Sequence, residues 1–223
     1  MTITQDMKQS VANTWEEGYR NPFVQGLGRG TLPQESFRFY LLQDYLYLAQ
    51  YAKVCALGSV SAPDAELQRR CILMQYRIVH TEQSLHEAYM ATWGISATDM
   101  KGTRQSQANR AYTNEMLVQA QGGDFCAFLA TILPCAWTYD DYARRLVTAY
   151  RKGLMANPYK PWLDTYTSEE YRSSYQWIIE TLNQMGKDRS SRERRHLIGI
   201  FGASVRAEVQ FWTMAYHRDM GTD

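Results

Sequence analysis

The chain has 223 residues, of which 45% are hydrophobic and 21% are charged. This length suits one large domain, or at most two small ones, with a substantial buried core. The 24 basic and 23 acidic residues leave a net charge of +1, and so weak a field argues against nucleic acid or an acidic membrane surface as a partner.

The elements predicted along the chain are all helices. Apolar residues recur every four positions from Met7 to Tyr19, and the Asn21-Pro22 pair ends that pattern. The segment Thr31-Leu-Pro-Gln34 has the form of a capping box, which predicts a long helix from there to about Ser59. Further helices are predicted over about 61–94, 104–121, 124–152, 167–185 and 190–218, with Pro134 expected to kink the third of these.

Signals for strands and for domain boundaries are missing from the sequence. No segment alternates between apolar and polar residues over a sustained run, and no Asn-Gly or Asp-Gly hairpin dipeptide occurs. There is no internal repeat and no long linker. We therefore expect one all-α domain of about eight helices over residues 1–223.

The N-terminal segment lacks the unbroken apolar run of a secretory signal. The most apolar stretch, 125–137, is interrupted by Thr131 and Pro134 and is shorter than the roughly 20 residues that cross a bilayer. The four cysteines form no Cys-x-x-Cys pair, which indicates reduced thiols rather than a zinc site or disulfides. We expect a soluble, cytoplasmic protein.

A first polar stripe lies on the helix predicted after Gln34. Tyr40, Asp44, Tyr47 and Tyr51 are spaced by four, three and four residues and share one face. Leucines around them predict that the helix, and Asp44 with it, is buried. A buried carboxylate costs several kcal/mol unless it is satisfied, so Asp44 either joins a structural salt bridge or tyrosine contact, or binds a ligand.

A second stripe follows Pro134, where Cys135, Tyr139 and Tyr142 are spaced by four and three residues. A cysteine in an apolar helix is usually a small core residue. The proline, however, removes a helical hydrogen bond and can open a gap where a ligand enters. A nucleophilic Cys135 is therefore the alternative to a structural one.

The third stripe is on the last helix, where Glu208 lies among Val205, Phe211, Trp212 and Tyr216. A carboxylate among aromatic rings tends to have a raised pKa, which suits proton transfer near neutral pH. Alternatively, Glu208 pairs with Arg206 or with solvent. Together the three stripes predict a pocket for a flat polar ring, because tyrosine offers both stacking area and a hydroxyl.

Four segments, FYLLQDYLYL, LPCAWTY, NPYKPW and AEVQFWTMAY, in this order and at these separations, resemble the thiaminase II or TenA family. The resemblance covers nearly the whole chain. It implies a haem-oxygenase-like helical fold, commonly in a homotetramer. It also implies hydrolysis of aminopyrimidines, namely thiamin and its aminomethyl aminopyrimidine breakdown product, to hydroxymethylpyrimidine for thiamin salvage. The implied reaction requires no metal or organic cofactor.

The resemblance also implies a role for each matching residue, and no motif position departs from the family pattern. Cys135 matches the nucleophile, Glu208 the acid and base, and Asp44 the carboxylate that holds the substrate. Tyr47 matches the tyrosine that raises the reactivity of the cysteine. Four other tyrosines match substrate-contacting positions of the pocket: Tyr51, Tyr112, Tyr139 and Tyr166.

Two other functions remain open. A haem or di-iron oxidoreductase on the same fold would need an axial histidine or a carboxylate–histidine cluster. The Glu-x-x-His match from Glu193 to His196 lies in a basic run and is interpreted as a solvated face. A non-catalytic pyrimidine-binding regulator would keep the pocket without the chemistry.

Overall fold

The computed structural model describes residues 1–82 and 90–222. Helices, turns and loops make up this part of the chain, and no strand occurs in it, which confirms the all-α prediction. The described residues form thirteen helical segments rather than about eight, because several of the predicted helices are divided. These segments fall into two compact units.

Unit 1 comprises Met1–Pro33 and Leu129–Thr213. It holds most of the two long helices α9 and α12, and it holds all of six shorter segments, among them the 3₁₀ helix η2. The bounds are α1 Ile3–Ser10, α2 Ala12–Arg20, α3 Pro22–Arg29, α9 Phe125–Ala149, η2 Arg151–Ala156, α10 Lys160–Thr167, α11 Glu169–Met185 and α12 Ser191–His217. Within this unit α11 packs against both α1 and α10, and α3 packs against η2.

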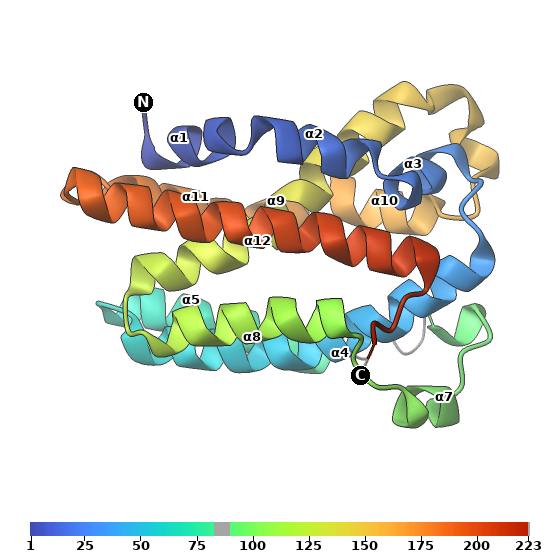
Figure 1. Cartoon of the computed structure of the whole chain (residues 1–223), viewed down its shortest axis with the longest axis horizontal. Coiled ribbons are helices and arrows are strands. Elements are labelled where there is room, and N and C mark those ends of the chain that lie inside the picture. The colour runs from blue at the N-terminus through green and yellow to red at the C-terminus, as the bar shows by residue number, and fades with distance from the viewer. Residues whose placement is uncertain (83–89, 223) are drawn as a thin grey trace. The chain divides into compact units, whose positions relative to one another are not determined.

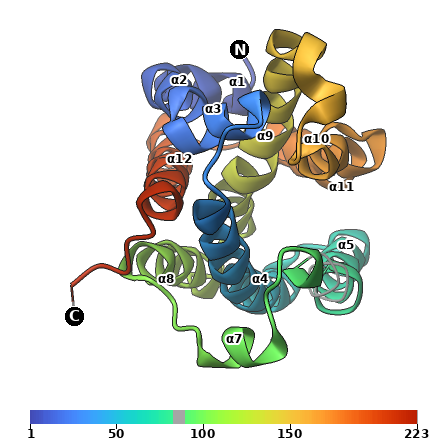
Figure 2. The same ribbon diagram turned by 90° about the vertical axis from the view of Figure 1, so that its right-hand side faces the viewer.

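Unit 2 comprises Gln34–Phe128 and Met214–Asp223. Its helices are α4 Gln34–Ser61, α5 Ala65–Arg77, the π-helix η1 Ile78–Glu82, α7 Ala97–Gly102 and α8 Gln107–Gln121. The long helix α4 lies between α5 and α8 (Figure 1; Figure 2) and packs against both. Gly58 allows one close approach in this unit, because a Cβ atom there would overlap the ring of Phe128.

Two predicted features near the N-terminus were wrong. The first predicted helix divides at Val11 into α1 and α2. The expected capping box at Thr31 does not form, because α4 begins only at Gln34. The N–H groups of Thr31 and Leu32 instead donate to the carbonyl of Gly26, at 3.0 and 3.2 Å, and so close the end of α3.

Three other helices begin within a few residues of their predicted starts, at caps that the structure identifies. Asp64 caps α5 by accepting a hydrogen bond from the N–H of Leu67 at 2.8 Å. Ser168, rather than Thr167, caps α11. At α12, Ser190 and Glu193 form a reciprocal capping box. The hydrogen bonds from Ser190 hold the pKa of Glu193 at about 2, below its ordinary value.

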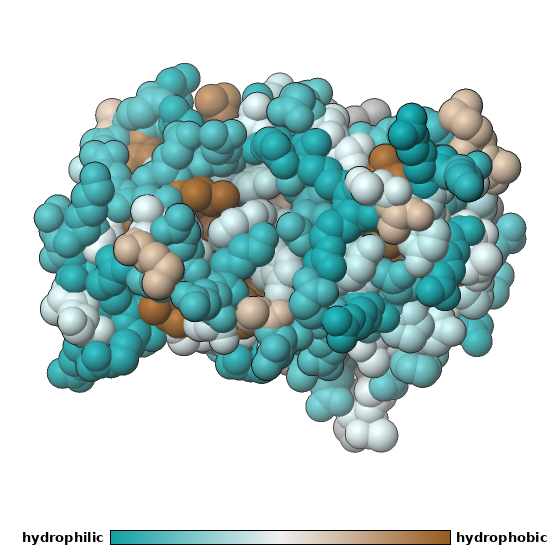
Figure 3. Space-filling model, turned by 90° about the horizontal axis from the view of Figure 1, so that it is seen from above, coloured by the Kyte–Doolittle hydropathy of each residue, from teal (hydrophilic) through white to brown (hydrophobic). Residues whose placement is uncertain are grey.

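The predicted helix over 61–94 is described only in part. It runs through α5 and η1 to Glu82, and residues 83–89 lie outside the described part of the chain. In the described ranges, no helix is both long enough and apolar enough to cross a membrane. Hydrophilic residues predominate on the face drawn in Figure 3, and hydrophobic ones are scattered over it.

Candidate active site

Four of the predicted site residues lie in unit 2, on the facing sides of α4 and α8. Asp44, Tyr47 and Tyr51 on α4 are 6%, 3% and 8% exposed, and Tyr112 on α8 is 2% exposed. The ring centroid of Tyr47 lies 5.3 Å from that of Tyr112 and 5.7 Å from that of Tyr51. The prediction that Asp44 is buried on a tyrosine-lined face is therefore confirmed.

A buried amide pair fixes the register of α4 against α8. The Nδ2 atom of Asn109 donates to the backbone carbonyl of Gln43 at 2.7 Å and to its Oε1 atom at 3.0 Å. Gln43 also accepts from the N–H of Ser106 at 2.9 Å and donates to the carbonyl of Arg104 at 2.9 Å. Gln43 and Asn109 are fully buried, and they adjoin Asp44 and Tyr112 along their helices.

Sequence reasoning missed this amide pair, although one signal for it was present. Gln43 stands beside Asp44 in the apolar run LLQDYL, and a buried amide requires hydrogen-bond partners as much as a carboxylate does. The partner, Asn109, is 66 residues away in sequence. Nothing in the local pattern of α8 distinguishes it from its neighbours.

The other four predicted residues lie in unit 1, and Cys135 is the predicted nucleophile among them. It follows Pro134 inside α9, and its side chain is half-buried, whereas those of the other three cysteines are buried. Proline has no N–H to donate, so one helical hydrogen bond is lost just before the cysteine. The hydroxyl of Thr138 donates to the carbonyl of Cys135 at 3.3 Å.

One turn beyond Cys135, Tyr139 is the centre of an aromatic cluster. Its ring centroid lies 4.7 Å from those of Tyr166 and Trp212, and 5.6 Å from that of Trp162. The rings of Trp162 and Tyr166 are 4.5 Å apart. Segments far apart in the sequence, from α9, α10 and α12, therefore meet around Tyr139.

Glu208 on α12 is 3% exposed, so the alternative that it faces solvent was wrong. Arg206 is exposed, and residues two apart on a helix point in different directions. Burial, together with the charge of Glu208, raises the pKa of Tyr142 well above its ordinary value. The hydroxyl of Tyr142 donates to the carbonyl of Trp15 at 2.8 Å, which fixes this ring beside Glu208.

A buried carboxylate that sequence reasoning missed follows Tyr139 directly. Asp140 accepts from Arg144 on α9 at 2.8 Å and from Arg172 on α11 at 3.2 Å. Burial and the Asp140 carboxylate raise the pKa of Tyr175. These contacts join α11 to α9 beside the Tyr139 cluster, and Tyr171 of α11 contacts Tyr166 with centroids 4.8 Å apart.

Each unit thus contains four of the predicted residues. In unit 1 they are Cys135, Tyr139, Tyr166 and Glu208, and in unit 2 they are Asp44, Tyr47, Tyr51 and Tyr112. The thiol, a buried acid and stacked rings in unit 1 could attack and protonate an aromatic ring. The buried carboxylate and tyrosines in unit 2 could hold an amino-substituted ring. Glu193 and His196 are both exposed, as the solvated-face interpretation predicts.

The chain is similar to known proteins over nearly its whole length. The aminopyrimidine aminohydrolase of Halalkalibacterium halodurans is 34% identical over 221 residues, covering 99% of this chain and 98% of the relative. A solved structure of a TenA family transcription regulator from Silicibacter sp. TM1040 superposes with a TM-score of 0.89 at 28% identity, covering 96% of both chains.

The fold itself has a more distant counterpart. A domain from Shewanella denitrificans, described as having a heme oxygenase-like fold, superposes with a TM-score of 0.76 at 15% identity, over 96% of this chain and 92% of that one. This confirms the predicted fold type. The sequence model of the TENA/THI-4/PQQC family matches residues 8–218. The chain therefore belongs to the TENA/THI-4/PQQC family.

Proposed function

We propose that the protein is an aminopyrimidine aminohydrolase of the thiaminase II type. It hydrolyses the exocyclic carbon–nitrogen bond of aminomethyl aminopyrimidine, and of thiamin, to give hydroxymethylpyrimidine for thiamin salvage. The observation that carries the proposal is the half-buried Cys135 one helical turn before the Tyr139 cluster. The full-length similarity to the H. halodurans aminohydrolase supports the substrate class.

Cys135 is the nucleophile in this proposal. An aminopyrimidine is aromatic, so its CH2–N bond breaks only after the ring has become electron-rich. The Cys135 thiolate adds to a ring carbon while Glu208 protonates a ring nitrogen. The amine or thiazole then leaves as an exocyclic alkene forms. Water adds to that alkene, the thiolate departs and the ring becomes aromatic again.

The tyrosines and Asp44 bind and orient the ring. Asp44 holds the amino group and a neighbouring ring nitrogen, a two-point contact that an oxygen-substituted ring cannot make. Tyr51, Tyr112, Tyr139 and Tyr166 contact the substrate. Tyr47 raises the reactivity of the thiol. Its hydroxyl donates to the Met116 sulfur at 3.6 Å, and a hydroxyl that donates can still accept a hydrogen bond.

The enzyme is further proposed to act as a homotetramer in the cytoplasm and to fold as one domain. The outer face of α5 supports self-association. Ile72, Leu73 and Tyr76 on α5 are 49%, 44% and 57% exposed, and Val79 at the start of η1 is 43% exposed, while Cys71 of α5 is buried. An exposed apolar patch of this kind marks a contact surface.

The activity is tested by replacing Cys135 with alanine. Ammonia release from aminomethyl aminopyrimidine and cleavage of thiamin are measured side by side for the unmodified protein and for the variant. The Cys135→Ala variant should lose turnover by a factor of about 10³ or more, since the covalent step has no substitute, while it still binds hydroxymethylpyrimidine. Cys126→Ala, a buried cysteine earlier in α9, is the matched control and should retain turnover.

The same assay separates the alternatives. Unchanged hydrolysis by Cys135→Ala would reject the mechanism. A non-catalytic regulator is favoured by one observation, the description of the Silicibacter relative as a transcription regulator. Tight pyrimidine binding by the unmodified protein with no released ammonia would support that function instead. An intense visible absorption band in the purified protein would support an oxidoreductase.

A further inference from the structure

A second candidate binding place lies at the C-terminal end of α9. It is a pocket of about 460 Å³ formed by unit 1 alone, and its lining residues are Gly28, Arg29, Thr148, Ala149, Tyr150, Arg151, Lys152 and Gly153. Ala149 follows Tyr139 by ten residues, which is about 15 Å along the helix at 1.5 Å per residue. The pocket is therefore separate from the Cys135 and Tyr139 region.

The charge of the pocket is strongly one-sided. Three of its eight lining residues are basic and none is acidic, although the whole chain carries a net charge of only +1. Within the described part of the chain, no ion pair involves Arg29, Arg151 or Lys152. By contrast, Arg144 and Arg145, one turn earlier in α9, both pair with carboxylates. The pocket thus concentrates positive charge that its own lining does not neutralise.

Hydrogen bonds hold the two walls of the pocket in place. The Tyr150 hydroxyl accepts from the Nε atom of Arg29 at 3.0 Å and donates to the Oε1 atom of Gln25 at 2.7 Å. Asn157, just after η2, donates to the carbonyls of Leu27 and Gly28 at 2.8 and 3.0 Å. The ends of α3 and η2 are therefore connected before any ligand arrives, which lowers the entropic cost of binding.

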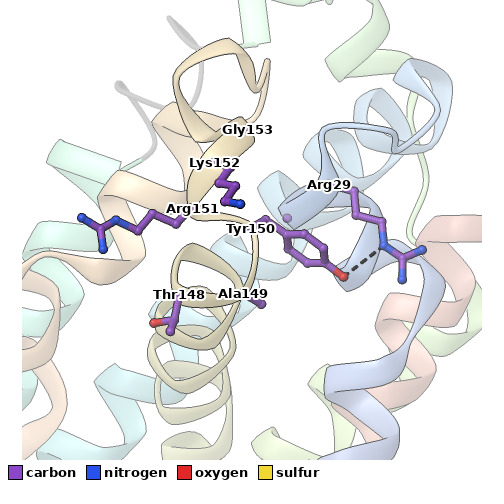
Figure 4. A pocket seen from close by; sticks show the side chains of 8 residues that line it. Arg29, Thr148, Ala149, Tyr150, Arg151, Lys152 and Gly153 are labelled. Atoms are coloured by element: carbon purple, nitrogen blue, oxygen red, sulfur yellow. Dashed lines mark hydrogen bonds between the residues drawn. The ribbon is translucent and has the colours of Figure 1, made fainter.

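Two of the three cations flank the Tyr150 ring. Figure 4 shows Arg29 bonded to the Tyr150 hydroxyl on one side and the Lys152 side chain extending toward the ring from the other, while Arg151 extends the opposite way. Guanidinium has five N–H donors, and Tyr150 uses one of them. The remaining donors of Arg29 and the ammonium of Lys152 are available to an anion.

We propose that this pocket binds a phosphate group through Arg29 and Lys152. The guanidinium of Arg29 and the ammonium of Lys152 line the same pocket, and together they match the several acceptor oxygens and double charge of phosphate better than the single charge of a carboxylate. The volume lies in the range of pockets for small organic ligands, so there is room for the organic part of a phosphate monoester. Free phosphate and an ester share the recognised group, and the experiment separates them.

The test is calorimetric titration of the full-length protein with phenyl phosphate, inorganic phosphate and uncharged phenol. Phenyl phosphate or inorganic phosphate should bind saturably at one site per chain, and phenol should not bind. Whichever phosphate binds more tightly identifies the source of the group. Arg29→Gln and Lys152→Gln should each weaken binding about tenfold, the loss of one charge-assisted hydrogen bond. Added NaCl should weaken it further.

Lys187→Gln is the matched control, because Lys187 is an exposed cation of unit 1 outside the pocket. It should change the affinity less than twofold. An equal loss in Lys187→Gln would show general charge attraction and overturn the proposal, as would the absence of saturable binding to either phosphate. Lys152 is exposed, so its variant folds even if Arg29→Gln does not. Binding is measured without pyrimidine, so failure here leaves the hydrolase proposal intact, and the reverse also holds.

Discussion

Cys135 differs from the other three cysteines in its access to solvent. Cys55, Cys71 and Cys126 are fully buried, whereas Cys135 is only half-buried. Burial raises the pKa of the Cys71 thiol to about 12, so at neutral pH it stays protonated. The thiolate is the reactive form of cysteine, and buried thiols are inert. We therefore expect Cys135 to be the one reactive thiol of the folded protein.

Alkylation of the native protein tests this difference. At pH 7.5, iodoacetamide should modify one thiol per chain, at Cys135, and the Cys135→Ala variant should take up none. Unfolding in denaturant should expose all four cysteines to the reagent. Peptide mass mapping identifies the labelled residue. A second cysteine modified at a similar rate in the native protein would contradict the prediction.

At the scale of the elements, the Gln43–Asn109 pair controls how α4 meets α8. Both side chains are fully buried, and Asn109 donates two hydrogen bonds to Gln43. Removing the Asn109 amide leaves buried acceptors on Gln43 without this donor, and such a group costs about 1–3 kcal/mol. The substitution also removes the contact between α4 and α8 that keeps Asp44, Tyr47 and Tyr112 in register.

The Asn109→Ala variant should accordingly lower the free energy of unfolding by about 1–3 kcal/mol and raise KM more than it lowers kcat. Urea unfolding and steady-state kinetics measure the two effects. Asn114→Ala changes the same residue type at an exposed position of α8, and it should alter stability by less than about 0.5 kcal/mol. Equal losses in both variants would show that the effect does not come from the contact with Gln43.

At the scale of the whole molecule, α9 and α12 each contribute residues to both units. One unit cannot unfold alone without interrupting these helices, so we expect a single cooperative thermal transition. Five of the six tryptophans lie in unit 1: Trp15, Trp137, Trp162, Trp177 and Trp212. Tryptophan fluorescence thus reports mainly on unit 1, and circular dichroism reports on both. Different midpoint temperatures from fluorescence and from circular dichroism would contradict the prediction that the chain folds as one domain.

The apolar outer face of α5 leads to a second expectation at this scale. If four chains associate through it, Tyr76→Glu should lower the mass measured by light scattering, because a buried carboxylate is costly in an apolar contact. Gln184→Glu, which adds the same charge at an exposed position of α11, should leave the mass unchanged. A tetrameric mass in both variants would place the contact elsewhere on the chain.

The sequence by itself determined the helical class and the faces that carry Asp44, Cys135 and Tyr139, because helical periodicity is a local property. It located most helices but misplaced some of their ends. Thr31 was predicted to cap α4, yet its N–H bonds to Gly26 and closes α3. Which helix a capping residue serves depends on which carbonyl its N–H can reach. The conformation of the folded turn determines which carbonyl that is.

Only the tertiary structure decided which polar groups are buried and what they contact. Arg206 and Glu208 stand two residues apart in the sequence, yet the first is exposed and the second is 3% exposed. Asp140 takes its partner Arg172 from 32 residues away. Such pairings depend on how helices pack across long separations along the chain, and local patterns of hydrophobicity and charge do not encode them.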